Sequence, residues 1–283
     1  MSRRTVLLIG HTGFMGRALQ QRLETADCHV LGFSRSQGGD LARADALDVF
    51  AGEPVDLVYH LGGVTGVAAS WKNPSLFYRV NMFGTQQVLE FCRRKQCPLV
   101  YVSTYVYGDP LRLPVDEEHP VRPATPYAHS KYMGEELCRF YHRYWGVGVN
   151  ILRPFNIYGL GQKASFLIPH LIRQIREKNM IEVRSLLPRR DFLYIDDAVD
   201  ALMLFLKTTT QQIYNLGSGV SYSVEDVIDL LQTLLGSCAD IVQSRAQVPN
   251  EVLEVRADCG RLRRTFGWSP KYGLEEGLRR MLA

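Results

Sequence analysis

The stretch TVLLIGHTGFMG, residues 5–16, decides the fold of this 283-residue chain. Its first five residues form a short apolar run of the kind that fills a buried parallel strand. Three glycines then follow at Gly-x-x-Gly-x-x-Gly spacing and lead into a helical pattern. Gly10 predicts a tight turn, Gly13 a close approach of the backbone to a pyrophosphate, and Gly16 close packing of helix on strand. A strand before the glycines and a helix after them indicate a dinucleotide-binding site.

The rest of the chain repeats this alternation of strand and helix. Apolar, strand-like runs occur at 5–9, 29–33, 56–61, 98–103, 148–152 and 212–216. Helical patterns fall near 14–24, 44–50, 75–95 and 127–145. Such alternation predicts an α/β fold with a parallel sheet covered by helices on both faces. A helix near 164–178, a strand near 181–184 and a helix at 223–235 remain, and we expect them to form a smaller, discontinuous lobe.

Composition excludes several classes of protein. The 33 basic and 29 acidic residues are interspersed and give a net charge of only +4, so no nucleic-acid surface is predicted. The six cysteines lack zinc-site spacing, so we predict no metal site and expect reduced thiols. No apolar run reaches the ~18 residues of a membrane span, and no signal-peptide pattern precedes the first strand. We therefore expect a cytoplasmic protein with no membrane partner.

Tyr127 and Lys131 stand four residues apart in a helical pattern. Side chains at i and i+4 share one helix face, so the phenol and the ammonium group can point into the same cleft. A phenol ordinarily has a pKa of about 10. A fixed cation nearby favours the phenolate and would lower that value. The pair predicts a proton carrier of the kind that alcohol–ketone interconversion needs beside a hydride donor. Lys131 has two expected roles: it lowers the pKa of Tyr127, and it holds the hydroxyls of the nicotinamide ribose.

The end of the second strand bears on the choice of cofactor. A carboxylate there binds the ribose hydroxyls of NAD, whereas an arginine accommodates the 2′-phosphate of NADP. The sequence at this point is FSRS, residues 33–36, which offers Ser34 and Arg35 but no carboxylate. This pattern favours NADP over NAD. The alternative is that Arg35 simply points into solvent.

Later motifs extend the pattern over nearly the whole chain. They are Asp40-Leu41, HLGG at 60–63, NMFGT at 81–85, VSTYVYG at 102–108, LRPFN at 152–156, RDFLYIDD at 190–197 and NLGSG at 215–219. With the glycine spacing, these motifs resemble an extended short-chain dehydrogenase/reductase of the NAD-dependent epimerase/dehydratase family. The resemblance implies a Rossmann-type doubly wound parallel sheet in residues 1–155 plus about 185–217. It also implies a small substrate-binding lobe from about 156–184 and 218–283.

The resemblance also implies roles for single residues. Those expected at the cofactor, NADP or NAD, are Gly10, Thr12, Gly13, Phe14, Met15, Gly16, Ser34, Arg35, Asp40, Leu41, Leu61, Gly62, Gly63, Asn81, Tyr127, Lys131 and Pro154. Those expected at the substrate are Thr65, Thr104, Asn156 and Arg190.

The catalytic set implied by the resemblance is Tyr127, Lys131 and a hydroxyl after the fourth strand. Counting forward from the strand gives Thr104, and counting back from the later Tyr-Gly gives Ser103; Thr104 is our first choice. The alternative is that both hydroxyls only cap the following turn.

By resemblance, Asn156 and Arg190 meet the diphosphate of a nucleotide sugar, and a guanidinium suits phosphate because it can bind two oxygens at once. An ion pair of Arg190 with Asp191 or Asp197 is the alternative. The family's basic residue near 247–251 is missing, and Arg245 or Arg256 could replace it.

One departure from the family pattern concerns the reaction. The dehydratase branch has Asp-Glu directly after the catalytic threonine, whereas this chain has Tyr105-Val106. We therefore expect no dehydration. The expected reaction is reduction of a keto-sugar nucleotide, of 4-ketoreductase type. The alternatives are epimerisation through a transient ketone, reduction of a non-nucleotide carbonyl compound, and a non-catalytic dinucleotide sensor, which would lack the Tyr/Lys/hydroxyl set.

The apolar residues of two helical segments indicate that the protein forms a dimer. Those near 75–95 and 127–145 carry apolar residues on more than one face, namely Leu76, Phe77, Val80, Phe83, Val88, Leu89, Phe91, Leu137, Phe140, Tyr141, Tyr144 and Trp145. A second apolar stripe is costly to expose to water, and such patches usually mark interfaces. The resemblance implies a homodimer in which these helices form a four-helix bundle about a twofold axis. The alternative is that the smaller lobe covers them.

Overall fold

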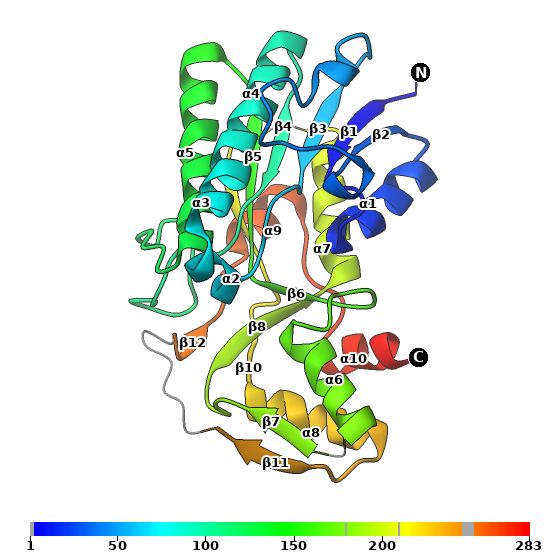
Figure 1. Cartoon of the computed structure of the whole chain (residues 1–283), viewed down its shortest axis with the longest axis vertical. Coiled ribbons are helices and arrows are strands. Elements are labelled where there is room, and N and C mark those ends of the chain that lie inside the picture. The colour runs from blue at the N-terminus through cyan, green and yellow to red at the C-terminus, as the bar shows by residue number, and fades with distance from the viewer. Residues whose placement is uncertain (1–2, 179, 209, 245–251) are drawn as a thin grey trace. The chain divides into compact units, whose positions relative to one another are not determined.

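The computed structural model describes residues 3–178, 180–208, 210–244 and 252–283 (Figure 1). The chain divides into two compact units. Unit 1 comprises 1–108, 120–154 and 199–214, and unit 2 comprises 109–119, 155–198 and 215–283. This division puts 109–119 and 185–198 in unit 2, whereas the sequence assigned both to the dinucleotide-binding domain. The strand in 185–198 pairs with other unit 2 strands, which explains its place.

Unit 1 contains a six-stranded sheet with the order β2-β1-β3-β4-β5-β9. Its strands are β1 (Thr5–Ile9), β2 (His29–Phe33), β3 (Leu57–His60), β4 (Leu99–Val102), β5 (Val149–Pro154) and β9 (Ile213–Leu216), whose first two residues lie in unit 1. The pairs from β2 through β5 are parallel. The chain runs from β1 outward to β2 and then returns to β3 on the other side of β1. The expected doubly wound sheet is confirmed, and ligands bind such sheets outside the carboxyl ends of the strands, where the strand order reverses.

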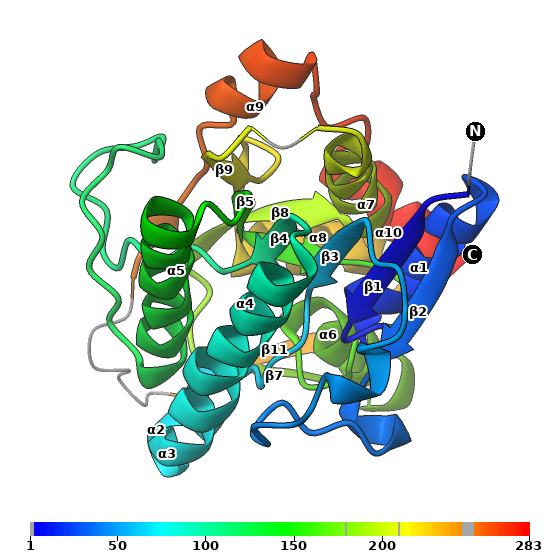
Figure 2. The ribbon, with the colours of Figure 1, turned by 90° about the horizontal axis from the view of Figure 1, so that it is seen from above.

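Helices cover both faces of this sheet. On one face lie α4 (Gly84–Lys95) and α5 (Pro126–Trp145), side by side in Figures 1 and 2. On the other lie α1 (Phe14–Thr25) and the unit 1 part of α7 (Ile195–Met203). An ion pair between Arg22 and Asp200 joins α1 to α7. The Tyr59 hydroxyl donates to the Leu202 carbonyl at 2.8 Å and so ties β3 to α7.

The core beneath α4 and α5 is made by apolar side chains of the central strands and of both helices. Its members include Leu7, Val58, Leu99, Tyr101, Val88, Leu89, Phe91, Cys138 and Ile151. The central strands β1, β3, β4 and β5 are buried at every position. Burial on both faces explains why these strands read as continuous apolar runs in the sequence.

Two helices expected in unit 1 differ in the structure. The helix near 75–95 is divided into α3 (Pro74–Phe77), a π-helical segment (Tyr78–Phe83) and α4. Such π-helical turns occur often at functional sites. The helix expected near 44–50 is wrong, because only a three-residue 3-10 turn, Asp48–Phe50, forms in this largely exposed stretch. A short helix not expected from the sequence, α2 (Val67–Lys72), follows β3.

Unit 2 is built around β8 (Arg189–Tyr194). This strand pairs with β6 (Asn156–Tyr158), β10 (Ser221–Ser223) and β12 (Glu254–Val255). A separate pair joins β7 (Met180–Val183) to β11 (Asp240–Gln243). The helices are α6 (Leu167–Lys178), α8 (Val224–Leu235), α9 (Gly260–Phe266) and α10 (Leu274–Leu282). The helices expected near 164–178 and 223–235 and the strand near 181–184 correspond to α6, α8 and β7.

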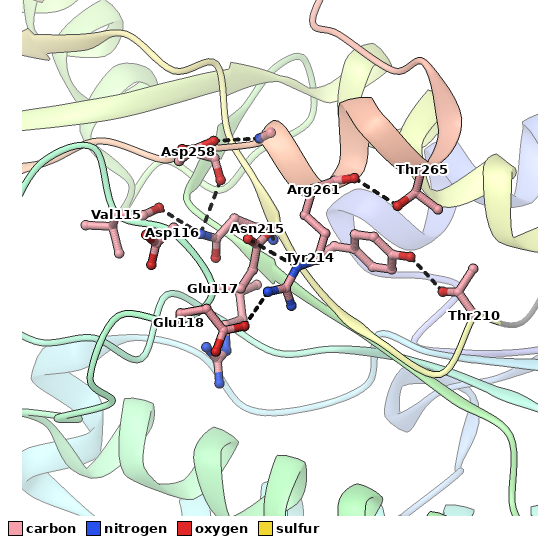
Figure 3. Close-up of polar contacts among 12 residues, drawn as sticks. Val115, Asp116, Glu117, Glu118, Thr210, Tyr214, Asn215, Asp258, Arg261 and Thr265 are labelled. Atoms are coloured by element: carbon pink, nitrogen blue, oxygen red, sulfur yellow. Dashed lines mark hydrogen bonds and ion pairs between the residues drawn. The ribbon is translucent and has the colours of Figure 1, made fainter.

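Buried polar groups hold unit 2 together. The Asn215 amide donates to the Val115 carbonyl at 2.8 Å, and its backbone N–H donates to Glu117 at 2.9 Å (Figure 3). Glu117 in turn lies 3.6 Å from the Arg261 guanidinium. In the same unit, the buried Asp191 carboxylate accepts hydrogen bonds from Ser218, Gly219 and Ala257. The NLGSG motif at 215–219 therefore serves the internal structure of unit 2.

Two further observations concern the state of the cysteines and the length and polarity of the helices. All six cysteines lie among the described residues and are free thiols, of which Cys238 alone is exposed. Within the described ranges, no helix has both the length and the apolar character that crossing a membrane requires.

Candidate active site

The glycine turn after β1 has the geometry that the sequence predicted. Gly10 has a φ of +88°, and a Cβ there would lie 2.8 Å from the Gly62 nitrogen. A Cβ on Gly16 would lie 2.1 Å from the Gly10 carbonyl oxygen, so only glycine allows α1 to pack this close. Gly13 is the exposed N-cap residue of α1, and it has no side chain to cap the first-turn N–H groups. Free N–H groups at a helix N-terminus suit an anion, so the turn fits the pyrophosphate of a dinucleotide.

Hydroxyl groups gather where β2 ends. Thr12 Oγ1 lies 2.8 Å from Ser36 Oγ, which lies 3.2 Å from Ser34 Oγ. The Gly10 N–H donates to the Phe33 carbonyl at 2.7 Å and ties the glycine turn to this strand end. Arg35 follows directly and is exposed. This end of the site therefore offers hydroxyls and a guanidinium group on one short segment.

Asp40 and Leu41, also expected at the cofactor, follow a few residues later. Asp40 is exposed, and its Oδ1 accepts a hydrogen bond from the Ala42 N–H at 2.9 Å. Leu41 is buried and packs against Gly62 and Gly84. The segment is thus anchored by a leucine, while the carboxylate stays at the surface.

The loop after β3 carries two consecutive glycines, Gly62 and Gly63. A Cβ on Gly62 would lie 2.8 Å from Ile9, and a Cβ on Gly63 would lie 2.8 Å from Asn81 Oδ1. That Asn81 oxygen accepts from the Val64 N–H at 2.8 Å. The two glycines therefore leave room for Ile9 and for the Asn81 amide. Thr65, expected at the substrate, follows and is exposed.

Asn81 links this loop to α5. It lies in the π-helical segment, is fully buried, and its Nδ2 donates to the Val64 carbonyl at 3.1 Å and to Ser130 Oγ at 3.0 Å. Ser130 Oγ donates to the Tyr127 carbonyl at 2.8 Å. The π-helical turn thus gives Asn81 an orientation that fixes the loop and the first turn of α5 together.

Tyr127 lies in that first turn of α5. The helix is capped by Thr125, whose side chain accepts from the Ala128 N–H, and the Phe77 ring packs edge-on against the Tyr127 ring at 6.2 Å. The Thr104 side chain hydrogen-bonds to the Tyr127 side chain. Burial raises the pKa of Tyr127 to about 12, although the hydrogen bond from Thr104 lowers it. The phenol is therefore protonated at neutral pH and can act as a proton donor.

This direction corrects the expectation that Lys131 lowers the pKa of Tyr127. Desolvation outweighs the stabilising contacts, and Thr104 makes the one favourable contact that acts on the phenol in the described structure. The Lys131 ammonium group lies over the Tyr101 ring, 4.3 Å from its centroid. Burial lowers the pKa of Lys131 to about 8, while Cys138 and Glu135 act to raise it. Lys131 therefore remains mostly charged at pH 7.

Ser103 and Thr104 differ in their contacts. Both are buried directly after β4, and the Ser103 N–H donates to the Leu152 carbonyl at 2.7 Å. The Ser103 hydroxyl has no hydrogen-bond partner among the described residues. The Thr104 hydroxyl bonds to Tyr127.

His60 was not singled out as a functional residue, but it lies close to this set. Its Nε2 is 3.1 Å from Thr85 Oγ1, and the Thr85 hydroxyl donates to the Asn81 carbonyl at 2.6 Å. Because the Thr85 hydrogen is used there, His60 Nε2 must be the donor to Thr85. Burial first, and then the Lys131 charge, lower the pKa of His60 well below its usual value, so the ring is neutral. In the sequence, a lone histidine in an apolar strand did not indicate that His60 lies beside the catalytic groups.

The residues expected at a diphosphate lie in unit 2. Asn156 Nδ2 donates to the Asp191 carbonyl at 3.2 Å. Arg190 Nη1 donates to the Arg189 carbonyl at 2.9 Å. In the described part of the chain Arg190 makes no ion pair, so the alternative of a pair with Asp191 or Asp197 is wrong: Asp191 accepts from backbone and serine donors, and Asp197 accepts from the Lys271 and Tyr272 N–H groups. Arg245 and the stretch 247–251 lie outside the described residues.

Comparisons with known proteins agree with this geometry. Residues 6–217 match the model of the NAD dependent epimerase/dehydratase family. The chain is 32% identical to the GDP-6-deoxy-D-mannose reductase of Pseudomonas aeruginosa over 98% of this chain and 96% of that protein. It is 30% identical to the UDP-glucuronate 4-epimerase of Thermodesulfobacterium geofontis over 85% of this chain and 76% of that protein.

Among solved structures, RMD from Pseudomonas aeruginosa in complex with NADPH superposes with a TM-score of 0.91. It is 31% identical, and the match covers 99% of this chain and 97% of that one.

Proposed function

Because this chain belongs to the NAD-dependent epimerase/dehydratase family, whose members are NAD(P)-dependent enzymes, we propose that it is an NADPH-dependent reductase of a keto-sugar nucleotide, of 4-ketoreductase type. The observation that carries this proposal is the end of β2, where Arg35 and the hydroxyls of Thr12, Ser34 and Ser36 stand in place of a carboxylate. A preference for NADPH favours net reduction. Epimerisation, in contrast, returns the hydride to the sugar and consumes no cofactor.

The catalytic groups of unit 1 support a reduction. The bound dinucleotide would supply a hydride to the substrate carbonyl carbon. Tyr127 donates its proton to the carbonyl oxygen, and its pKa of about 12 means that the proton is present at neutral pH. Thr104 holds the phenol by a hydrogen bond and stabilises the negative charge that grows on the oxygen. Lys131 supplies a positive charge near the ribose hydroxyls.

The Thr104 contact also supports Thr104 over Ser103 as the catalytic hydroxyl. A group already bonded to the proton donor is aligned with the reacting oxygen before substrate arrives. The unpartnered Ser103 hydroxyl is then a second donor that substrate could satisfy.

In this proposal, Asn156 and Arg190 of unit 2 bind the diphosphate of a nucleotide sugar. The part-buried Arg190 side chain uses one N–H on the Arg189 carbonyl, which leaves further donors for phosphate oxygens. The reductase relative, whose name specifies a GDP-linked sugar, supports this class of substrate.

Epimerisation through a transient ketone is a second candidate. The same Tyr127, Thr104 and Lys131 set can move a proton in either direction, and the similarity to a UDP-glucuronate 4-epimerase favours it. A tightly held NAD that survives purification would identify this activity.

Binding separates the candidates first. A thermal-shift screen with NADPH, NADH and the nucleoside diphosphates UDP, GDP, dTDP and CDP measures which ligands raise the melting temperature. The proposal expects a larger shift with NADPH than with NADH, and a further shift with one nucleoside diphosphate. A larger shift with NADH contradicts the cofactor assignment, and no shift with any nucleoside diphosphate contradicts the substrate class.

A homodimer through α4 and α5 completes the proposal. On α5, Phe140, Tyr144 and Trp145 are about half exposed. The Tyr144 and Trp145 rings pack against the Phe140 ring, with centroids 4.6 Å and 5.4 Å from its centroid. Within the helix expected near 75–95, the large apolar side chains of α4 are buried, whereas Leu76, Val80 and Phe83 are partly buried. The dimer contact therefore centres on α5, with the polar edge of α4 at its rim.

The assembly has a direct test. Sedimentation at micromolar concentration should give a mass near twice 32.1 kDa, and Phe140→Ser with Tyr144→Ser should give the monomer. A monomeric wild-type protein would contradict the proposed dimer.

The free thiols fit a reducing compartment, and we place the enzyme in the cytoplasm on that ground.

A further inference from the structure

One buried ion cluster in unit 1 joins the three segments that carry the proposed catalytic groups. Its members are Tyr107, after β4; Glu135, on α5; and Arg153, near the end of β5. None of the three residues is more than 1% exposed. Neither the sequence motifs nor the proposed reaction gave these residues a role.

The contacts within the cluster are close and directional. The Arg153 guanidinium binds the Glu135 carboxylate through Nε at 3.0 Å and through Nη2 at 2.6 Å. Its third nitrogen, Nη1, donates to the Tyr107 hydroxyl at 3.0 Å, and the Tyr107 ring centroid lies 4.9 Å from the guanidinium carbon. Burial alone would lower the pKa of Arg153, but the hydrogen bonds and charge of Glu135 raise it above its ordinary value, so the guanidinium is charged.

Each member lies within four residues of a proposed functional residue along the chain. Tyr107 follows Thr104 by three residues, and Glu135 follows Lys131 by one helical turn on the same face of α5. Arg153 immediately precedes Pro154. A movement of any member would therefore move a group that contacts cofactor or substrate.

Stability does not account for this cluster. Removing two charges from water costs several kcal/mol per ion, and apolar residues of similar volume often serve a core as well or better. What a bidentate pair adds is geometry, because the planar guanidinium fixes the direction of each partner. The cluster therefore suits a task that needs orientation within a fraction of an ångström.

We propose that Tyr107, Glu135 and Arg153 are positioning residues that hold Thr104 against the Tyr127–Lys131 turn of α5. The expected effect of the cluster on the reaction rests on the proposed function. Its expected effect on the positions of residues 103–108 and of the α5 turn does not. Tyr107 acts through Thr104, and Glu135 acts through the α5 turn.

Tyr107→Phe is the sharpest variant, because it removes the hydroxyl that accepts from Arg153 and leaves the ring over the guanidinium. Tyr59→Phe is the matched control. Tyr59 is also fully buried in unit 1, and its hydroxyl makes one hydrogen bond, to the Leu202 carbonyl, with no contact to the cluster. Both variants lose the same group, so a merely structural role predicts the same losses in both.

The first measurement needs no substrate. Hydrogen exchange followed by mass spectrometry should show severalfold faster exchange in peptides covering 103–108 in Tyr107→Phe than in wild type. In Tyr59→Phe these peptides should exchange as in wild type. Equal exchange in both variants overturns the inference, whatever reaction the enzyme catalyses.

The second measurement uses turnover of a nucleoside-diphosphate 4-keto sugar with NADPH. Tyr107→Phe should lower kcat about 10- to 100-fold with KM and NADPH affinity unchanged, and it should cause no further loss in a Thr104→Ala background. A kcat equal to that of Tyr59→Phe, or a full additional loss in the Thr104→Ala background, overturns the inference. A wild type that turns over no keto sugar counts against the proposed function alone, and the exchange experiment still decides the role of the cluster.

Discussion

Thr104 and Lys131 are buried and Tyr127 is half-buried at one end of the carboxyl edge of the unit 1 sheet, whereas Arg35 and Ser36 are exposed at the other end. At the buried end the surroundings shift the pKa of the phenol to about 12 and that of the ammonium group to about 8. At the open end, hydroxyls bond to one another across two short loops.

The difference shows where this fold is constrained. A buried charge or phenol must be held by its neighbours, so each change at the buried end disturbs both stability and chemistry. An exposed guanidinium is held by little, so the open end can change cofactor preference without disturbing the sheet. Variants at the buried end should therefore produce large effects on rate or stability, and variants at the open end should produce selective effects on affinity.

The largest effect is expected at Tyr127. Tyr127→Phe removes the proton donor and should lower kcat about 10³-fold, while the affinity for NADPH stays within about twofold. Stopped-flow fluorescence for binding and absorbance at 340 nm for turnover measure the two quantities. A variant that keeps a tenth or more of wild-type kcat would exclude Tyr127 as the acid.

Lys131→Met should stabilise the protein while it inactivates the enzyme. A pKa of about 8 in the fold, against 10.5 for a free lysine, corresponds to a cost of about 3 kcal/mol at pH 7. The contact over the Tyr101 ring offsets about 1 kcal/mol of this cost. The free energy of unfolding of the cofactor-free variant should therefore rise by about 2 kcal/mol at pH 7.

The pH dependence of that gain has a definite sign. Below pH 8 both folded and unfolded Lys131 are protonated, so the cost is constant. Between pH 8 and 10.5 the folded lysine loses its proton first, so wild type gains stability relative to the variant and the difference shrinks. Denaturant unfolding at pH 7, 8, 9 and 9.5 measures it. A difference that grows above pH 8 contradicts the account.

The two hydroxyls after β4 sharpen the comparison within the buried end. Thr104→Ala removes the group that bonds the phenol and should lower kcat about 10²-fold. Ser103→Ala removes a hydroxyl without a partner in the described structure and should cost less. Steady-state kinetics on both variants rank them, and the reverse order would transfer the role to Ser103.

The smallest effect is expected at the open end. Arg35→Ala should weaken NADPH binding about tenfold, as expected for a charged hydrogen bond, and leave NADH binding unchanged. The loss should fade at high salt because the group is exposed. Isothermal titration with both cofactors at two salt concentrations measures this. Equal weakening of NADPH and NADH binding would show that Arg35 does not read the 2′-phosphate.

The sequence predicted unit 1 better than unit 2, for a physical reason. The central strands of the large sheet are buried on both faces, so their apolar runs are unmistakable. Glycine is required at positions 10 and 16 because a Cβ there would lie 2.8 Å and 2.1 Å from backbone atoms. In unit 2, β12 has two residues and β10 has three, which is too short for any periodic pattern to appear. Their pairing depends on β8, which is distant in the sequence.

The candidate site was predictable in its members but less so in its electrostatics. Spacing indicated Tyr127 and Lys131, and the family resemblance indicated Thr104. The sequence could not show that burial governs the pKa of the phenol, because desolvation depends on which neighbours the fold brings around it. The pairing of Glu135 with Arg153, eighteen residues later, was equally hidden, because the partners meet only once α5 packs beside β5.

The central claim is net reduction of a keto-sugar nucleotide by NADPH. The most direct test incubates the purified enzyme with NADPH and a panel of nucleoside-diphosphate 4-keto sugars, and counts product against cofactor consumed. The account predicts one reduced sugar nucleotide for each NADPH oxidised, with at least one member of the panel, and no reaction in Tyr127→Phe. Interconversion of two sugar nucleotides without net loss of cofactor would contradict it and would identify an epimerase.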